Sequence, residues 1–296
     1  MQPATPQRFT IFGGTGFIGS HLVAHLRDQG HECHVPGRDE VLRSTDPLGH
    51  VVYCIGLTAD FRSKPFETVE AHTGLFANLL RTANFGSLLY LSSTRLYQNS
   101  DSGDETASFK TNPSNPSDLY NLSKLTAECL CLSLDLPNVR IARLSNVYGP
   151  DFVSENFLVG VIRDAVERRF VRLDVHPDGA KDYVSIADVT AMLERIALDG
   201  RHRIYNVAAG CNVTNREILT ALRKLAGCTE EWVPDSPLVR AQPISIARLS
   251  EEFCYVPHQL SQQLPSLVAL YRANLTKAER PKAQAPAMAG ERGGRG

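Results

Sequence analysis

The 296-residue sequence lacks any apolar run long enough to cross a membrane, and residues 1–7 lack the basic region and long apolar stretch of a secretory signal. It also lacks an excess of charge: the formal net charge is -1, and the basic residues are spread along the chain. These absences argue against nucleic acid or a membrane as the main partner. We therefore expect a cytoplasmic protein whose partner is a small molecule.

The cysteines form no Cys-x-x-Cys pair. Seven are present, an odd number at wide spacings, which indicates free thiols in a reducing compartment. Cys129 and Cys131 lie two apart on a predicted helix and point to different faces, so they cannot share a metal ion. His21 and His25 lie four apart on another predicted helix, but no third ligand is evident and a solvated helix face is favoured. The sequence predicts no metal site.

A glycine-rich loop near the start is the first positive signal. An apolar strand pattern over residues 8–12 leads into the segment Gly13-Gly14-Thr15-Gly16-Phe17-Ile18-Gly19 and then into a helical pattern. Glycines let a backbone approach a pyrophosphate closely, and the start of a helix offers free N–H groups and a positive dipole end. A tight turn without a ligand is the alternative, because such motifs also arise by chance. The position after a strand favours a dinucleotide site.

Strand and helix patterns alternate through the first two thirds of the chain. The expected strands are 8–12, 32–35, 51–55, 88–92 and 139–144, and the helices between and after them are 17–29, 66–83, 118–134 and 154–169. This alternation predicts an α/β fold, a Rossmann-type doubly wound parallel sheet with helices on both faces.

The pattern changes after about residue 145. The expected pieces are helices near 186–198, 214–226 and 261–274 and strands near 171–174 and 204–207. We therefore predict a dinucleotide-binding region over 1–145 and a smaller, mainly substrate-binding lobe over 146–275, some segments of which return to the sheet. Residues 276–296 lack periodicity, which predicts a disordered tail.

Tyr120 and Lys124 lie four residues apart at the start of a predicted helix and share one face. A phenol with an ordinary pKa of about 10 is a poor base, but a neighbouring ammonium and an oxidised nicotinamide would favour the phenolate. It would then exchange a proton with a substrate hydroxyl. An amphipathic helix with an exposed lysine is the alternative.

Ser92 and Ser93 end the fourth predicted strand, where ligands of doubly wound sheets bind. One of them is expected to meet the substrate. Hydroxyls at such a position also satisfy local backbone groups, and the sequence leaves both roles open.

With these motifs, residues 8–274 resemble the extended short-chain dehydrogenases/reductases of the NAD(P)-dependent nucleotide-sugar epimerase/dehydratase family. The matches are Gly13, Gly16 and Gly19 to Gly-x-x-Gly-x-x-Gly, Ser93 and Tyr97 to Ser-x-x-x-Tyr, and Tyr120 and Lys124 to Tyr-x-x-x-Lys. The resemblance implies that Tyr120 moves the proton, Ser93 bonds the reacting oxygen, and Lys124 holds the nicotinamide ribose. It also implies a homodimer formed through helices that flank the active site.

Further matches lie later in the chain. Residues 143–150 are similar to the family's Arg-x-x-Asn-Val-Tyr-Gly-Pro segment, which implies that Asn146 contacts the substrate. Residues 181–189 resemble its Arg-Asp-Tyr-Val-His-Val-x-Asp-Val segment, with Lys181 in place of the first arginine, which keeps the charge but loses the bidentate fork. Arg240 stands where the family has a diphosphate-binding arginine, with Gln242 in place of a common aspartate.

One difference from the family's dehydratases limits the reactions to be expected. Nucleotide-sugar 4,6-dehydratases have Asp-Glu after the catalytic hydroxyl, whereas this chain has Thr94-Arg95, which disfavours dehydration. The resemblance then implies an enzyme that transfers a hydride, either an epimerase or a keto-reductase of a nucleotide-activated sugar. The alternatives are a reductase of a non-nucleotide carbonyl compound and a non-catalytic dinucleotide-binding regulator.

The cofactor is expected to be NAD or NADP. Its expected contacts are Gly13, Thr15, Gly16, Phe17, Ile18, Gly19, Arg38, Tyr120 and Lys124. The acidic residue that binds a ribose 2′-hydroxyl is not at Pro36 or Gly37, and Arg38 would pair with a 2′-phosphate, which slightly favours NADP. Asp39 would serve NAD if the strand ended later, and a surface Arg-Asp turn is the third alternative.

Overall fold

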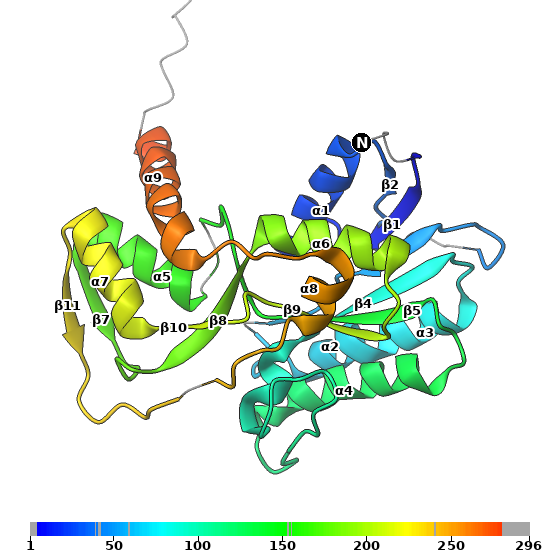
Figure 1. Cartoon of the computed structure of the whole chain (residues 1–296), viewed down its shortest axis with the longest axis horizontal. Helices are drawn as coiled ribbons and strands as arrows, with labels where there is room; N and C mark the ends of the chain where they lie inside the picture. The colour runs from blue at the N-terminus through cyan, green and yellow to red at the C-terminus, as the bar shows by residue number, and fades with distance from the viewer. Residues whose placement is uncertain are drawn as a thin grey trace, which may run out of the picture.

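The larger lobe is built on a parallel sheet. A computed structural model describes residues 5–38, 40, 43–58, 60–152, 154, 156–239 and 241–279, and Figure 1 shows how their helices and strands are arranged. Within these residues the sheet has six strands in the order β2 (Glu32–His34), β1 (Arg8–Phe12), β3 (His50–Tyr53), β4 (Ser87–Ser93), β5 (Val139–Leu144) and β9 (Ile204–Val207). All neighbouring strands are parallel. The predicted Rossmann-type sheet is confirmed.

The strands are apolar on both faces because helices cover both. Every residue of β4 except the last is buried, as are Phe9 and Ile11 of β1. The strand order reverses at β1, since β2 lies on one side of it and β3 and the later strands on the other. Ligands bind at such a switch point, beyond the carboxyl ends of the strands. The loops after β1, β3 and β4 therefore border the expected site.

Helices α1 (Phe17–Asp28) and α6 (Ile186–Asp199) pack on one face of the sheet, and α4 (Asp118–Ser133) lies on the other (Figure 1). The segment predicted as one helix over 66–83 lies beside α4. It consists of α2 (Pro65–Val69), a π-helical turn η1 (Glu70–Gly74) and α3 (Leu75–Thr82). A π-helical turn is rare and is frequently found at functional sites.

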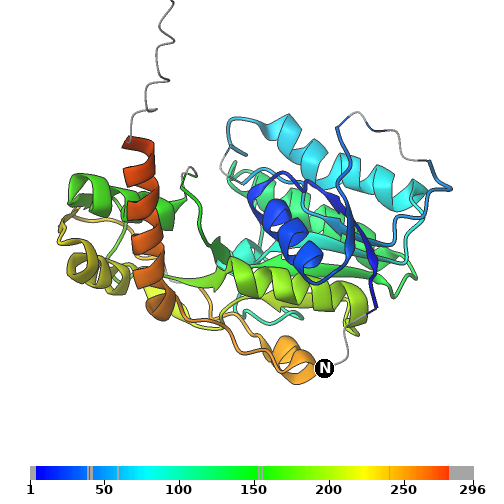
Figure 2. The same cartoon turned by 90° about the horizontal axis from the view of Figure 1, so that it is seen from above.

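The smaller lobe has its own apolar core. Its elements are β6 (Asn146–Tyr148), α5 (Phe157–Arg163), η3 (Asp164–Arg168), β7 (Phe170–Leu173), β8 (Ala180–Ser185), β10 (Asn212–Thr214), α7 (Asn215–Ala226), β11 (Thr229–Trp232) and α9 (Leu260–Glu279). Figure 2 shows this lobe, with α9 in orange-red, set to one side of the larger lobe. Its core is formed by the apolar side chains Leu158, Ile162, Ile218, Leu222, Leu264 and Val268. No helix in the described part of the chain has both the length and the apolar character needed to cross a membrane.

Local sequence signals explain the bounds of α7. Thr214 accepts a hydrogen bond from the Glu217 amide, and the Glu217 carboxylate accepts one from the Thr214 amide, which forms a reciprocal cap at the start of the helix. Gly227, with a φ of 66°, ends it in the left-handed conformation that glycine adopts without strain.

Two sequence predictions are wrong in detail. Residues 276–279, which were predicted to belong to a disordered tail, continue α9 to Glu279, and the earlier turns of this helix pack on the smaller lobe. Residues 280–296 lie outside the described residues. The short strands β6, β8, β10 and β11 and helix α8 (Ala247–Phe253) were not predicted, because elements of three to seven residues carry little periodicity.

The predicted solvated face at His25 is also wrong. His25 Nε2 lies 2.6 Å from Glu194 Oε2, and His31 Nε2 lies 2.9 Å from Glu194 Oε1. His31 Nδ1 accepts from the Gln7 amide, so its Nε2 carries the proton and donates to the carboxylate. This cluster joins α1 and the start of β2 to α6.

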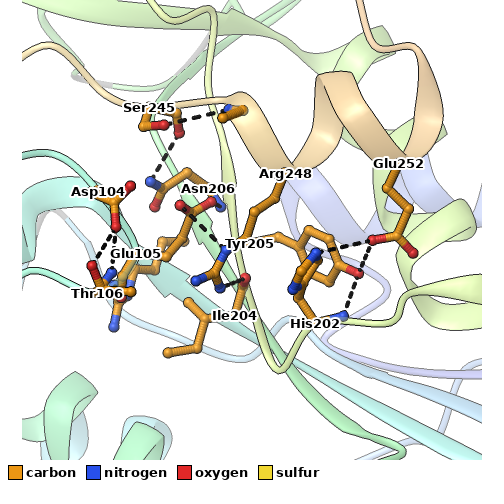
Figure 3. Close-up of polar contacts among 12 residues, drawn as sticks. Asp104, Glu105, Thr106, His202, Ile204, Tyr205, Asn206, Ser245, Arg248 and Glu252 are labelled. Carbon is orange, nitrogen blue, oxygen red and sulfur yellow. Dashed lines mark hydrogen bonds and ion pairs between the residues drawn. The ribbon is translucent and has the colours of Figure 1, made fainter.

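A buried polar network attaches the loop after β4 to β9 and α8 (Figure 3). The Asn206 amide donates to Glu105 Oε1 at 3.1 Å, and Arg248 Nε lies 3.7 Å from Glu105 Oε2. The Asn206 side chain donates to the Ser245 carbonyl at 3.0 Å and accepts from the Tyr97 hydroxyl at 2.8 Å. The network therefore fixes the connection that runs from Ser93 to Tyr120.

Candidate active site

The glycine loop after β1 forms a cradle that only small residues fit. Gly13 has a φ of +77°, and a Cβ there would lie 3.0 Å from the Cys54 carbonyl carbon. A Cβ at Gly19 would overlap the Gly13 carbonyl oxygen, so Gly19 lets α1 approach the loop. α1 begins after Gly16 with no side-chain cap and no acidic residue in its first turn. These open amides fit the phosphates of a dinucleotide, and Thr15, Phe17 and Ile18 lie at the same turn.

The end of β2 carries the residues that would meet the cofactor's ribose. Arg38 is exposed in the loop that follows β2. Glu40 bonds its own neighbours instead, since its carboxylate lies 2.8 Å from His34 Nε2 and accepts from the Gly37 amide at 3.0 Å. Asp39, the alternative that would favour NAD, lies outside the described residues.

Ser93 ends β4 and begins the 3-10 helix η2 (Thr94–Asn99). Its hydroxyl accepts from the Arg95 amide at 3.1 Å and lies close enough to Tyr120 to lower the pKa of the phenol. Ser93 therefore has the local capping role, and it also lies beside Tyr120; its contact with a substrate stays a prediction. The Ser92 hydroxyl is buried on the other side of the strand without a partner among the described residues.

Tyr120 and Lys124 occupy successive turns of α4 and are both buried. Lys124 Nζ donates to the Leu91 carbonyl at 2.8 Å and lies 4.8 Å from the centre of the Tyr90 ring. A Cβ added to Gly56 would lie 3.5 Å from this Nζ. The segment 54–56 after β3 therefore contacts both the glycine loop, through Cys54, and Lys124. The candidate catalytic side chains and the cofactor cradle meet across this segment.

Burial shifts the protonation of both side chains. It raises the pKa of Tyr120 above its ordinary value of 10.0, while the Ser93 hydrogen bond and the positive charge of Arg95 act in the opposite direction. Burial lowers the pKa of Lys124 from 10.5 to about 7, against the pull of the Glu128 carboxylate. The phenol is therefore protonated at neutral pH, and the amine is close to its titration midpoint.

His72 joins the π-helical turn η1 to α4. The Leu57 amide donates to His72 Nε2 at 3.2 Å, so the ring proton sits on Nδ1, which donates to Ser123 Oγ at 2.8 Å. Ser123 in turn donates to the Tyr120 carbonyl at 3.0 Å. Burial lowers the pKa of His72 to about 3, which keeps the ring neutral. The relay holds the loop after β3 against the turn that carries Tyr120.

The guanidinium of Arg95 lies over the Tyr120 ring. Its Cζ lies 5.8 Å from the centre of the Tyr120 ring and 5.4 Å from that of Phe61. Arg62 packs on the same Phe61 ring, with its Cζ at 4.5 Å. Phe61 and Tyr120 are 5.4 Å apart between ring centres. The guanidinium groups of Arg62 and Arg95 therefore both pack against the pair of rings formed by Phe61 and the candidate catalytic Tyr120.

Two of the predicted substrate residues, Asn146 and Lys181, lie in the smaller lobe. Asn146 is exposed at the start of β6, and its amide group donates to the Asp182 carbonyl at 2.7 Å. Lys181 lies on β8, with Nζ 5.8 Å from the centre of the Phe157 ring. Desolvation of its amine, and to a smaller extent the charge of Arg95, lowers the pKa of Lys181. Arg240 lies outside the described residues. Across the described part of the chain, no three His, Cys, Asp or Glu side chains are grouped to hold a metal ion.

Sequence reasoning missed the environment of the phenol. Arg95 was noted only as a departure from dehydratases, and Phe61, Arg62 and His72 were not singled out. A lone histidine in a helical pattern carries no signal, because only the tertiary fold brings it to Ser123. The Phe61-Arg62 pair offers a weak signal, since an aromatic next to an arginine after a predicted strand is common in loops.

Comparisons with known proteins agree with the resemblance. The model of the NAD dependent epimerase/dehydratase family matches residues 9–208. The chain is 28% identical over 263 residues to the GDP-6-deoxy-D-mannose reductase of Pseudomonas aeruginosa, over 79% of this chain and 85% of that protein. It is 24% identical over 257 residues to the dTDP-glucose 4,6-dehydratase of Streptomyces griseus, over 82% of this chain and 76% of that protein.

The fold is also shared with solved structures. The structure of RMD from Pseudomonas aeruginosa complexed with NADPH has a TM-score of 0.75 to this chain at 24% identity, over 90% of this chain and 99% of that one. The family match spans most of the residues that build the sheet, the glycine loop and the Ser93, Tyr120 and Lys124 group. This chain therefore belongs to the NAD dependent epimerase/dehydratase family.

Proposed function

We propose that the protein is an NAD(P)-dependent epimerase or keto-reductase of a nucleotide-activated sugar. The observation that carries the proposal is the convergence of Ser93, Tyr120 and Lys124 at the carboxyl end of β4, next to a loop that contacts the glycine cradle. Relatives that reduce, dehydrate or epimerise nucleotide sugars support the substrate class.

The protonated state of Tyr120 supports the reduction of a carbonyl group. When bound, the nicotinamide would supply or accept the hydride. Tyr120 holds its proton at neutral pH and would give it to a sugar carbonyl oxygen as a hydroxyl forms, while Ser93 would hydrogen-bond the same oxygen. Lys124, buried beside the Leu91 carbonyl, would hold the nicotinamide ribose. For inversion of a hydroxyl the same phenol would first remove the proton and then return it.

The exposed Arg38 supports NADP over NAD, because a guanidinium pairs with a 2′-phosphate and the Glu40 carboxylate is already bonded to His34 and Gly37. Gly13, Gly16 and Gly19, with Thr15, Phe17 and Ile18, would hold the pyrophosphate. Asn146, Lys181 and Arg240 would hold the nucleotide sugar. The seven free cysteines support a reducing, cytoplasmic location.

The function is tested by a panel of nucleotide sugars and their 4-keto forms. Purified protein is expected to oxidise NADPH faster than NADH with at least one keto sugar, or to interconvert two sugar epimers with bound cofactor. Melting temperature is measured in parallel, because a ligand that binds only the folded form raises it. Turnover of simple aldehydes with no response to any nucleotide sugar would favour the carbonyl reductase instead, and cofactor binding without any turnover would favour a regulator.

We infer a homodimer from an apolar surface on the helices beside the site. Phe66 is 86% exposed, and Val69 and Leu75 lie on the same helical segment with 42% and 47% exposed. Leu132 on the adjacent α4 is 43% exposed. Large apolar side chains gathered on neighbouring helices are typical of an interface between subunits.

Phe66→Asp is expected to weaken this dimer by at least about 30-fold in Kd, because it replaces a central aromatic contact with a charge. Sedimentation velocity over a concentration series measures the change. Val256→Asp is the matched control, since Val256 is 84% exposed but lies on the connection between α8 and α9. A monomeric wild-type protein, or equal dissociation of both variants, would contradict the interface.

A further inference from the structure

Among the described residues, no carboxylate forms an ion pair with the guanidinium of Arg95, which lies beside Tyr120. Its Nε is buried and has no hydrogen-bond partner among the described residues. The carboxylate of Asp118 acts on the charge of Arg95, but it accepts hydrogen bonds from the Asn112 amide at 2.8 Å and from the Asn121 side chain at 3.2 Å. A cation that is desolvated and unpaired costs free energy unless an anion reaches it.

Two further cationic side chains, those of Arg62 and Lys181, lie near Arg95. Arg62 shares the Phe61 ring with Arg95, and its Nε is bonded to the Ser117 hydroxyl at 3.2 Å rather than to a carboxylate. Lys181, on β8 of the smaller lobe, is close enough for its charge and that of Arg95 to repel. No ion pair within the described residues involves Arg62, Arg95 or Lys181. Like charges gathered from two lobes without compensation form a site for an anion.

We propose that Arg95, assisted by Lys181, binds a carboxylate carried by the sugar of the substrate, so that the enzyme acts on nucleotide-activated uronic acids. This inference rests on the proposed function and names its substrate class. The planar fork of arginine suits a carboxylate, which accepts two parallel N–H donors.

The distance to Tyr120 favours the sugar carboxylate over the diphosphate. The Arg95 Cζ lies 5.8 Å from the Tyr120 ring centre, so an anion bound to Arg95 would lie near the phenol and close to the sugar whose oxygen Tyr120 contacts. A carboxylate attached beside the reacting carbon satisfies both contacts. The diphosphate is attached at the anomeric carbon and reaches this place only if the reaction occurs on the neighbouring carbon.

The test compares sugar nucleotides that differ only in the carboxylate. The pairs are UDP-glucuronate with UDP-glucose, UDP-galacturonate with UDP-galactose, and GDP-mannuronate with GDP-mannose, with UDP and GDP alone as the diphosphate arm. Binding is measured by calorimetry on the full chain saturated with NADP⁺, in the Tyr120→Phe background to prevent turnover. The variants are Arg95→Met, Arg95→Lys and Arg172→Met, the last a control that removes an exposed arginine paired at 3.9 Å with Glu231 in the smaller lobe.

In at least one pair the uronate is expected to bind on the order of 10- to 100-fold more tightly than its neutral twin, the range of a charged hydrogen bond. Arg95→Met should remove this preference, Arg95→Lys should retain part of it, and Arg172→Met should keep it. Melting temperatures establish that each variant is folded. If Arg95→Met does not fold, a reduced preference for the uronate in Arg95→Lys is the test of the inference.

Two results would overturn the inference while the proposed function stands. One is equal affinity for both members of every pair that binds, and the other is a loss on Arg95→Met that is as large for UDP or GDP alone as for the uronate, which would assign Arg95 to the diphosphate. If none of these sugar nucleotides binds although NADP⁺ does, the inference fails, and the panel of nucleotide sugars described under the proposed function decides whether that function fails with it.

Discussion

Tyr120→Phe is expected to lower kcat by about 10²- to 10⁴-fold, the contribution that a positioned proton donor makes to catalysis. The ring stays in place because Phe61 and His72 pack against it at 5.4 and 5.1 Å between ring centres, so only the hydroxyl is lost. The Kd for the nicotinamide cofactor is expected to change little, since the glycine loop supplies its main contacts. Single-turnover kinetics separate the chemical step from binding.

Tyr271→Phe is the control for this loss. It removes a phenol hydroxyl from a hydrogen bond of 3.1 Å with Glu167 in the smaller lobe, and kcat should stay the same. Wild-type turnover in Tyr120→Phe would remove this residue from the mechanism. A loss of cofactor binding equal to the loss of kcat would assign the phenol to the cofactor instead.

Lys124→Met should change how stability depends on pH. The wild-type amine has its pKa lowered from 10.5 to about 7 by burial. Below pH 7 the folded and unfolded chains both hold the proton, and the folded chain carries the full cost of a buried charge. Between pH 7 and 10.5 the folded amine is neutral while the unfolded one stays charged, so the unfolded state binds more protons and stability rises with pH. Methionine removes this titration.

The expected size is large. At about 1.4 kcal/mol for each pKa unit, the free energy of unfolding of the wild type should gain at most about 5 kcal/mol relative to Lys124→Met over this pH range. Urea unfolding at several pH values measures the difference. Lys110→Met is the control, because Lys110 is exposed and paired with Asp101. Parallel pH profiles for wild type and Lys124→Met would show that the amine titrates normally in the folded chain.

The sequence predicted the large elements of the fold because their patterns are strong. Long apolar strands such as β4, buried on both faces, and helices such as α6 with a clear apolar stripe were placed within a few residues. The short strand β8 was not predicted, since its register with β6 and β10 depends on partners that lie 30 residues or more away. The end of α9 was misjudged because its last turns lack a periodic apolar stripe.

The residues of the candidate site that belong to a sequence motif could be predicted from the sequence. Ser93, Tyr120 and Lys124 follow from spacing on a helix and position at a strand end. In the structure Ser93 lies beside Tyr120, and Lys124 bonds the Leu91 carbonyl of the same strand, while their catalytic roles stay predictions. Arg95 and His72 could not be assigned in this way, because their roles depend on what lies across the site. The Ser123 hydroxyl that meets His72 is 51 residues along the chain, and Lys181 is farther still from Arg95.

The polar network around Asn206 has a consequence for how the chain folds. Asn206 is on β9, Glu105 is in the loop after β4, and Ser245 and Arg248 come from the segment between β11 and α9, with Arg248 in α8. In a chain shortened to its first 240 residues, Asn206 would lose the Ser245 carbonyl and Glu105 would lose Arg248, and both side chains are buried in the larger lobe. The larger lobe is therefore not expected to reach its full stability without the segment 241–253, although that segment comes late in the chain.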